Sequence, residues 1–261
     1  MVNVNDLKKM FENSSQGKKS TNQLMTPKKL EKSNITSPLE LNKLGNSEVK
    51  KSEKNNKQHP ENINVGLKVS GGGDLEKWMQ SNINIYNQLS EENRAAIQRY
   101  TGGKYRVYNE KLRSGKMFVN IRKSLDEVIT ALGELPDYSG EVYRGAALKK
   151  DIADKLKVGD IIFDPAFLST SVDKESAEGF LKKSSKNEGD LGYFMSLNVI
   201  HGKSLMDPNL TQFSESEAEV LLLPGTKIEI TNIEFKNSNI YIYGKEIEST
   251  SQTPINIYNG V

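Results

Sequence analysis

The chain has 261 residues, a mean hydropathy of −0.61 and a net charge of +2, which favours one folded domain with a polar segment outside its core. It contains no cysteine and only two histidines, His59 and His201, so disulfides, thiolate nucleophiles and histidine-rich metal sites are excluded. We expect no metal. No apolar run approaches the roughly 20 residues that span a bilayer, and we expect no transmembrane segment.

Residues 1–73 are predicted to be a disordered basic tail. They hold 13 Lys and no Arg against seven acidic residues, so the net charge divides into +6 here and −4 on 74–261. Such a segment cannot bury enough apolar surface to offset its ordering entropy. Without arginines or interleaved aromatics it indicates a solvated arm, not a nucleic-acid-binding surface. One helical face, formed by Val4, Leu7, Met10 and Phe11, could dock on a partner or membrane or form a transient helix without a role.

Three helices are predicted after the tail. The triple glycine at 71–73 marks the boundary, because it breaks structure and supplies a hinge, and no dinucleotide-binding or P-loop glycine motif occurs in the chain. Apolar residues then recur at helical spacing over 75–89. A second helix begins at Ser90 and continues through Tyr100. A third covers 109–132 and is broken at Gly133 and Pro136.

Short β-like runs bounded by Gly, Pro, Asn and Asp follow these helices. They lie at 142–144, 161–163, 167–171, 193–197, 219–223, 227–230 and 240–242, with one predicted helix at 174–181. Helices followed by strands indicate an α+β fold with a mainly antiparallel, two-sheet core instead of a doubly wound sheet.

Three polar segments of this strand-rich part carry candidate chemistry: Tyr143-Arg144-Gly145, Ser169-Thr170-Ser171 and Glu217-Ala218-Glu219. Residues i and i+2 of a strand point the same way, so Glu217 and Glu219 are expected to share a face. Paired carboxylates suit reactions through an oxocarbenium ion. NAD fits that scheme, because its nicotinamide–ribose bond is N-glycosidic and the cationic leaving group needs no acid.

Each segment alone also has an ordinary structural interpretation. The Glu-x-Glu pattern occurs again at 215/217 and 246/248, and a solvated strand face explains any single pair. A surface ion pair would explain Arg144, and an edge strand would explain 169–171. The order and the surroundings of the three segments must therefore decide between a structural and a catalytic interpretation.

In that order, the segments resemble the arginine-specific bacterial ADP-ribosyltransferase toxins, whose signature is Arg, Ser-Thr-Ser and Glu-x-Glu and which include the actin-modifying binary toxins. The likeness covers about 75–230. It includes Tyr100-Thr101-Gly102-Gly103-x-Tyr105, Tyr108-Asn109-x-x-Leu112-Arg113, Val142-Tyr143-Arg144-Gly145, Phe167-Leu168-Ser169-Thr170-Ser171 and Ser216-Glu217-Ala218-Glu219-Val220-Leu221-Leu222-Leu223-Pro224-Gly225-Thr226. The family's pair directly precedes an apolar strand, which selects Glu217/Glu219 over Glu215/Glu217.

The resemblance implies two roughly perpendicular antiparallel sheets that form an NAD cleft, flanked by N-terminal helices, in a catalytic domain at 74–261. Glu219 would contact the 2′-hydroxyl of the nicotinamide ribose, and Glu217 would position the incoming guanidinium. Ser169 would support NAD and orient the catalytic carboxylate, and Arg144 would hold the NAD phosphates and ribose. The implied NAD-binding residues are Arg144, Gly145, Ser169, Asn109, Arg113 and Glu219.

The implied activity is transfer of ADP-ribose from NAD to an arginine of actin or another host protein, with release of nicotinamide. Residues 207–216 would meet the target, with Phe213 as the recognition aromatic, although the family often places its aromatic where Ser214 stands. We expect a monomer, delivered to a host cytosol without a Sec signal peptide. An NAD glycohydrolase and a non-enzymatic binding module with a relic cleft remain open alternatives; the adjoining motifs disfavour a carbohydrate-processing enzyme.

Overall fold

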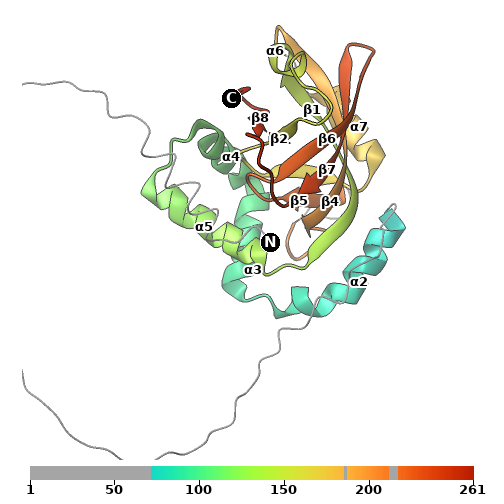
Figure 1. Cartoon of the computed structure of the whole chain (residues 1–261). Helices are drawn as coiled ribbons and strands as arrows, with labels where there is room; N and C mark the ends of the chain where they lie inside the picture. Colours follow the sequence, from blue (N-terminus) through green and yellow to red (C-terminus); the bar gives the residue numbers. More distant parts are fainter. Residues whose placement is uncertain (1–71, 185–186, 212–216) are drawn as a thin grey trace, which may run out of the picture. The chain divides into compact units, whose positions relative to one another are not determined.

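The computed structural model describes residues 72–184, 187–211 and 217–261, and the predicted tail with its apolar helical face lies outside them. Helices come first in the described chain and strands follow (Figure 1). The N-terminal helices are α2 (Gly72–Gln88), α3 (Glu91–Arg99), η1 (Tyr100–Lys104), α4 (Tyr105–Ser114) and α5 (Val119–Gly133). This order confirms the α+β prediction.

Local sequence signals explain most of these helix ends. Ser90 caps α3 by accepting a hydrogen bond from the Asn93 amide at 3.1 Å, as its position before two glutamates predicts. Helix α2 begins at Gly72, so two of the three boundary glycines belong to a helix and not to a hinge. The single helix predicted at 109–132 is wrong. Gly115 adopts the left-handed conformation, with φ 66°, and ends α4 before α5 begins.

The predicted strand segments all fall on observed strands, and several strands extend further. The strands are β1 (Asp137–Lys149), β2 (Ile161–Phe163), β3 (Leu168–Ser171), β4 (Asp190–Ser204), β5 (Glu219–Leu222), β6 (Lys227–Lys236), β7 (Asn239–Ile247) and β8 (Ile255–Asn256). Two more helices, α6 (Lys150–Ala153) and α7 (Lys174–Lys183), lie between them. The two-residue strand β8 is too short for a periodicity to indicate it.

Hydrogen bonds connect the eight strands in the order β1-β3-β5-β4-β7-β6-β2-β8. Strand β1 also pairs with β4, so β1, β3, β5 and β4 close a ring of four strands. The pairs are antiparallel except β4–β7 and β2–β8. The strands expected in two sheets are therefore connected in one eight-stranded sheet through β1 and β4, whose 13 and 15 residues are long enough to pair with more than one neighbour.

One main apolar core joins the helices to the strands. Tyr86 of α2, Ile97 of α3 and Leu132 of α5 pack in the same cluster as Leu197 of β4 and Val220 of β5, and all are fully buried. Figure 1 shows α3, α4 and α5 grouped on one side of the strands, with α7 on another. This arrangement places η1, the start of β5 and α7 around one opening.

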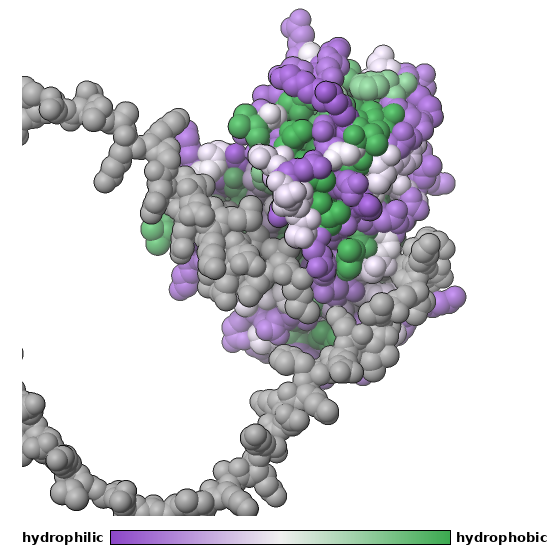
Figure 2. Space-filling view, in the orientation of Figure 1, coloured by the Kyte–Doolittle hydropathy of each residue, from purple (hydrophilic) through white to green (hydrophobic). Residues whose placement is uncertain are grey.

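The surface is mixed in character. On the face seen in Figure 2, hydrophilic side chains predominate and apolar ones are interspersed among them. Among the described helices, none has both the length and the apolar composition that a membrane crossing requires.

Candidate active site

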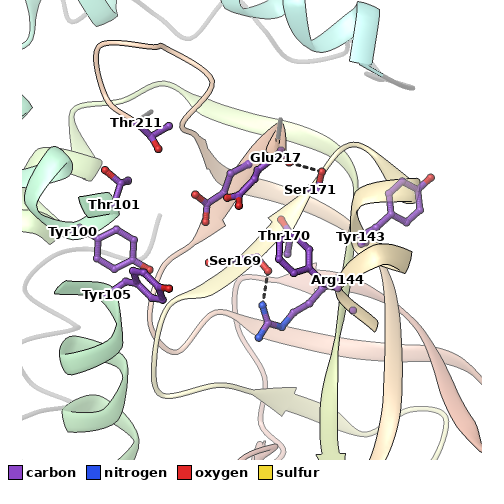
Figure 3. A pocket seen from close by; sticks show the side chains of 14 residues that line it. Tyr100, Thr101, Tyr105, Tyr143, Arg144, Ser169, Thr170, Ser171, Thr211 and Glu217 are labelled. Atoms are coloured by element: carbon purple, nitrogen blue, oxygen red, sulfur yellow. Dashed lines mark hydrogen bonds between the residues drawn. The ribbon is translucent and has the colours of Figure 1, made fainter. Parts of the chain in front are cut away.

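A pocket of about 290 Å³ opens between the N-terminal helices and the strands, and it brings together the three predicted polar segments (Figure 3). The helical side of the pocket is seen at the left of Figure 3, facing Arg144 and Ser169. The lining residues come from six parts of the chain and are Tyr100, Thr101, Tyr105, Tyr143, Arg144, Gly145, Ser169, Thr170, Ser171, Ala177, Phe180, Thr211, Glu217 and Glu219.

Arg144 projects from β1 into this pocket and is fixed at two points. Its Nε donates a hydrogen bond to the Tyr193 hydroxyl at 2.7 Å, and its Nη1 donates to the Ser169 carbonyl oxygen at 2.7 Å. A guanidinium has five N–H donors, so three are left over from these two bonds. Among the described residues Arg144 bonds a tyrosine hydroxyl and a carbonyl oxygen and not a surface carboxylate, so the alternative interpretation as a surface ion pair is wrong.

The three residues of the Ser-Thr-Ser segment have three different contacts. Ser169 presents its carbonyl oxygen to Arg144. The Thr170 hydroxyl donates to the Val220 carbonyl oxygen, and the Ser171 hydroxyl donates to the Glu217 carbonyl oxygen at 2.7 Å. Since β3 pairs with β5, the segment holds the chain around both glutamates in place.

Both glutamates line the pocket, but the predicted strand geometry for them is wrong at Glu217. Strand β5 begins only at Glu219, which lies opposite Ser171 of β3. Glu217 precedes the strand, and Ala218 between them has a positive φ of 43°. The bonds from Ser171 and from the Val172 amide to this turn hold it in place, so a turn and not strand alternation brings the two carboxylates into one pocket.

The site shifts the ionisation of both carboxyl groups in the same direction. Burial, with a smaller contribution from the charge of Glu217, raises the pKa of Glu219 to about 7 against the opposing effects of Ser169 and Arg144. Burial also raises the pKa of Glu217. Two carboxyl groups in one partly desolvated pocket, beside one fixed arginine, are suited to stabilise positive charge that develops on a bound substrate.

Gly145 lines the pocket and also determines how α7 packs. A Cβ at this position would lie 2.1 Å from the Ala177 carbonyl oxygen and 2.6 Å from the Leu181 amide nitrogen. Only glycine therefore permits α7 to approach β1 this closely. The position after Arg144 thus sets the wall of the pocket that carries Phe180.

Two predicted NAD contacts, Asn109 and Arg113, do not line the pocket. Arg113 forms a two-point ion pair with Asp164, with Nη2 at 2.7 Å from Oδ2 and Nε at 3.1 Å from Oδ1. Asn109 accepts a hydrogen bond from the Phe167 amide at 3.2 Å, directly before β3. Both support the β2–β3 connection behind the site. Phe213, the predicted recognition aromatic, lies outside the described residues.

The sequence reasoning assigned no role to Tyr100 and Tyr105, whose rings line the pocket 6.3 Å apart. The Tyr105 amide bonds the Tyr100 carbonyl oxygen, the i to i+5 bond of a π-helix, and Gly103 has a φ of 119°. The adjacent glycines Gly102 and Gly103 were the available sequence signal for an irregular helical turn. Such π-helical turns are frequent at functional sites. Phe180 was also missed, since an ordinary helical pattern surrounds it, and Thr211 was predicted only as part of the target-facing segment 207–216.

The described residues contain no cluster of His, Cys, Asp or Glu that could hold a metal ion. A helix-flanked, mainly antiparallel sheet, with Arg144, Ser-Thr-Ser and two glutamates around a single pocket, defines the ADP-ribosyltransferase class of fold. The sequence matches the ADP-ribosyltransferase exoenzyme family over residues 75–250. The chain belongs to that family and is an ADP-ribosyltransferase with NAD as its substrate.

Individual relatives are bacterial proteins. The chain is 28% identical over 193 residues to the putative NAD⁺–arginine ADP-ribosyltransferase Vis of Vibrio splendidus, covering 71% of this chain and 77% of that protein. It is 27% identical over 170 residues to the NAD⁺–protein-arginine ADP-ribosyltransferase Tre1 of Serratia proteamaculans, covering 64% of this chain and 35% of Tre1. The solved structure of the Vis toxin superposes with a TM-score of 0.62 at 25% identity, covering 72% of this chain and 90% of the Vis chain.

Proposed function

We propose that this protein transfers a single ADP-ribose from NAD to an arginine of another protein and releases nicotinamide. The observation that carries the proposal is the convergence of Arg144, the Ser-Thr-Ser segment, Glu217 and Glu219 on one pocket. The names of Vis and Tre1 support arginine as the acceptor. A carboxylate at Glu217 supports it physically, because a guanidinium is always cationic and matches a carboxylate in fork geometry.

The proposed mechanism assigns each charged group a separate step. The N–H donors that Arg144 keeps after its two protein bonds hold the NAD phosphates. The glycosidic electrons leave with nicotinamide, which departs neutral, and the Glu219 carboxylate stabilises the positive charge left on the ribose. A guanidinium nitrogen of the target, positioned by Glu217, then bonds to the ribose carbon and gives up a proton to the Glu217 carboxylate. No acid is needed for departure.

The remaining site residues have supporting roles in this proposal. Ser169 orients Glu219 and fixes Arg144 through its carbonyl oxygen. Gly145 contributes pocket wall and lets α7 approach. Asn109 and Arg113 are weaker candidates for direct NAD contact, because their side chains bond Phe167 and Asp164. Residues 207–216, including Phe213, form the proposed target-recognition segment.

Labelled NAD incubated with the full chain and a host-cell lysate tests this function. Labelled protein bands that are lost on hydroxylamine treatment, to which arginine-linked ADP-ribose is sensitive, support arginine transfer. Free ADP-ribose without labelled protein would instead establish a glycohydrolase, and neither product would leave a binding module. Actin is one target to test in purified form, since the sequence resembles actin-modifying toxins.

Substitution of the two glutamates is expected to separate their roles. Glu219→Gln should lower both arginine transfer and NAD hydrolysis about a hundredfold or more, the scale of a lost electrostatic stabiliser. Glu217→Gln should abolish transfer while much of the slow hydrolysis persists, since water needs no guanidinium anchor. Both changes keep side-chain shape and should leave the fold intact.

Steady-state rates for both reactions, with agmatine or a target protein as acceptor, measure this difference. Glu215→Gln serves as the control for register and should change neither rate. Equal losses in both reactions for the two variants, or damage from Glu215→Gln, would show that the assignment of roles is wrong.

We further propose that the tail predicted at residues 1–73, of which 1–71 precede α2, serves delivery or localisation, and that the enzyme acts as a monomer on a protein of another cell. The basic, aromatic-poor composition supports the first point, because such a segment has little to bury. The relationship to the Vis toxin supports action on a protein of another cell. Sedimentation of the purified chain measures the oligomeric state, and fractionation of exposed host cells locates the enzyme.

A further inference from the structure

Tyr193 lies directly behind Arg144 and outside the lining of the pocket. In the β1–β4 ladder Arg144 is opposite Met195, and Ala146 is opposite Tyr193. Arg144 and Tyr193 are therefore diagonal neighbours on one face of the sheet, within reach of long side chains. The Tyr193 ring is 4% exposed, and its centroid lies 6.0 Å from the Arg144 Cζ atom.

The two bonds to Arg144 fix the plane of its guanidinium. Tyr193 accepts from Nε at 2.7 Å on one edge, and the Ser169 carbonyl oxygen accepts from Nη1 at 2.7 Å on the other. The guanidinium is planar through conjugation, so two bonds from different nitrogens fix its plane, and turning it about the Cδ–Nε bond would break at least one of them. The remaining N–H donors consequently have one direction, and Arg144 itself lines the pocket.

We infer that Tyr193 is a positioning residue that orients Arg144 for the phosphates of NAD, an inference that rests on the proposed function of Arg144. Phenylalanine at this position would keep the ring and its packing but would leave the buried Nε–H without its acceptor. The guanidinium would then turn toward another acceptor or carry an unpaired donor, and either change weakens its grip on a bound phosphate. The effect belongs to ground-state binding and not to bond cleavage.

The test compares Tyr193→Phe with the full wild-type chain in NAD hydrolysis and in calorimetric titration with NAD. We expect KM and Kd for NAD to rise about tenfold while kcat stays within about twofold. Arg144 holds the phosphates equally in the ground state and the transition state, and loss of such an interaction raises KM without lowering kcat. Tyr86→Phe is the matched control. It removes one hydroxyl from a fully buried tyrosine that bonds the Ser204 carbonyl oxygen, away from the pocket, and it should lower thermal stability without a change in KM.

Arg144→Lys distinguishes failure of this inference from failure of the proposed function. Lysine has no N–H group equivalent to the Nε–H of Arg144 that Tyr193 accepts. Tyr193→Phe should therefore raise KM little further in a chain that already carries Arg144→Lys, so the two effects should not be additive. If Arg144→Lys weakens NAD binding and Tyr193→Phe does not, Tyr193 only packs and the inference is wrong. If Arg144→Lys itself leaves NAD affinity unchanged, the proposed role of Arg144 is wrong.

Discussion

The ionisation of Glu219 depends on its burial and on three neighbouring residues of the pocket. Its side chain belongs to the pocket wall, where burial and, to a smaller extent, the charge of Glu217 raise its pKa to about 7. Arg144 and Ser169 limit the shift. An ionised carboxylate is the form that stabilises an oxocarbenium ion, so the free enzyme exists near neutral pH as a mixture of competent and incompetent forms.

We therefore expect the pH profile of NAD hydrolysis to report Glu219. Protonation below its pKa removes the required negative charge, so kcat/KM should fall about tenfold per pH unit below a midpoint near 7 and level off above it. Glu219→Gln has no charge to lose and should flatten that limb at a low residual rate. Initial rates between pH 5 and 9 measure both profiles. A midpoint near the ordinary glutamate value of 4.5 would show that the carboxyl group stays hydrated in solution.

For single residues such as Glu217 and Glu219, the sequence predicts which side chains share the pocket but not the backbone conformation that brings them there. The motif identified both carboxylates correctly as neighbours in one pocket. The alternation rule placed Glu217 on a strand, but the chain turns at Ala218 with a φ of 43°, a conformation uncommon for a residue with a Cβ. Nothing local favours that turn; bonds from Ser171 and Val172 on the neighbouring strand end impose it.

At the scale of elements, the sequence predicted the helix that carries Arg113 and Asn109 but not the partners of their side chains. Helical spacing placed them on one helix, and α4 does contain both. Their partners, Asp164 and the Phe167 amide, lie more than 50 residues further along the chain. Only the packing of α4 against the β2–β3 connection brings these groups together, and helical periodicity carries no information about it. The break at Gly115 was likewise visible as a glycine, but a single glycine within a helical pattern is often tolerated.

The segment from Asp207 to Thr211 is the first part of the proposed target-recognition segment, and side chains of α3 and η1 hold it. Asp207 is 4% exposed and accepts two hydrogen bonds from Asn209, each of 2.8 Å. From the helical side, Gln98 bonds the Asn209 carbonyl oxygen at 2.8 Å, and Thr101 bonds the Leu210 carbonyl oxygen at 2.9 Å. This turn fixes Thr211, which lines the pocket, at the start of the segment that is expected to meet the target.

Asp207→Ala should consequently impair protein modification more than NAD cleavage. The turn loses its buried acceptor, so Thr211 is no longer held at its place in the pocket wall, within the segment proposed to meet the target. We expect arginine transfer to fall about tenfold and hydrolysis to change by less than about threefold. Asp207→Asn keeps an acceptor oxygen and should retain most transfer. Parallel assays with a protein acceptor and with water alone measure the split, and equal losses in both would mean that the turn supports the whole pocket.

At the scale of the whole molecule, the α+β order, the strand segments and the pocket-forming motifs could be predicted, because they depend on local periodicity and on residue types. The connection of both expected sheets through β1 and β4 could not, since strand length alone does not state which neighbours a strand will pair with. The pocket depends on that pairing. Ser171 meets Glu219 only because β3 lies between β1 and β5.

Gly72 is the proposed boundary between the delivery segment and the catalytic domain. Helix α2 begins there, and its buried side chains Trp78, Met79 and Tyr86 belong to the main core. Deletion of residues 1–71 leaves this helix whole and should leave both the melting temperature and the rate of NAD cleavage close to those of the full chain.

Deletion of residues 1–89 is the contrasting variant. It removes Tyr86, which is fully buried and bonds the Ser204 carbonyl oxygen, and loss of a buried aromatic side chain alone costs about 3–5 kcal/mol. This variant should not fold stably. Calorimetric melting and NAD hydrolysis of the two purified truncations measure the difference. Loss of hydrolysis in the shorter deletion would show that residues 1–71 take part in the catalytic domain, because the helices, strands and pocket of the described chain would all still be present.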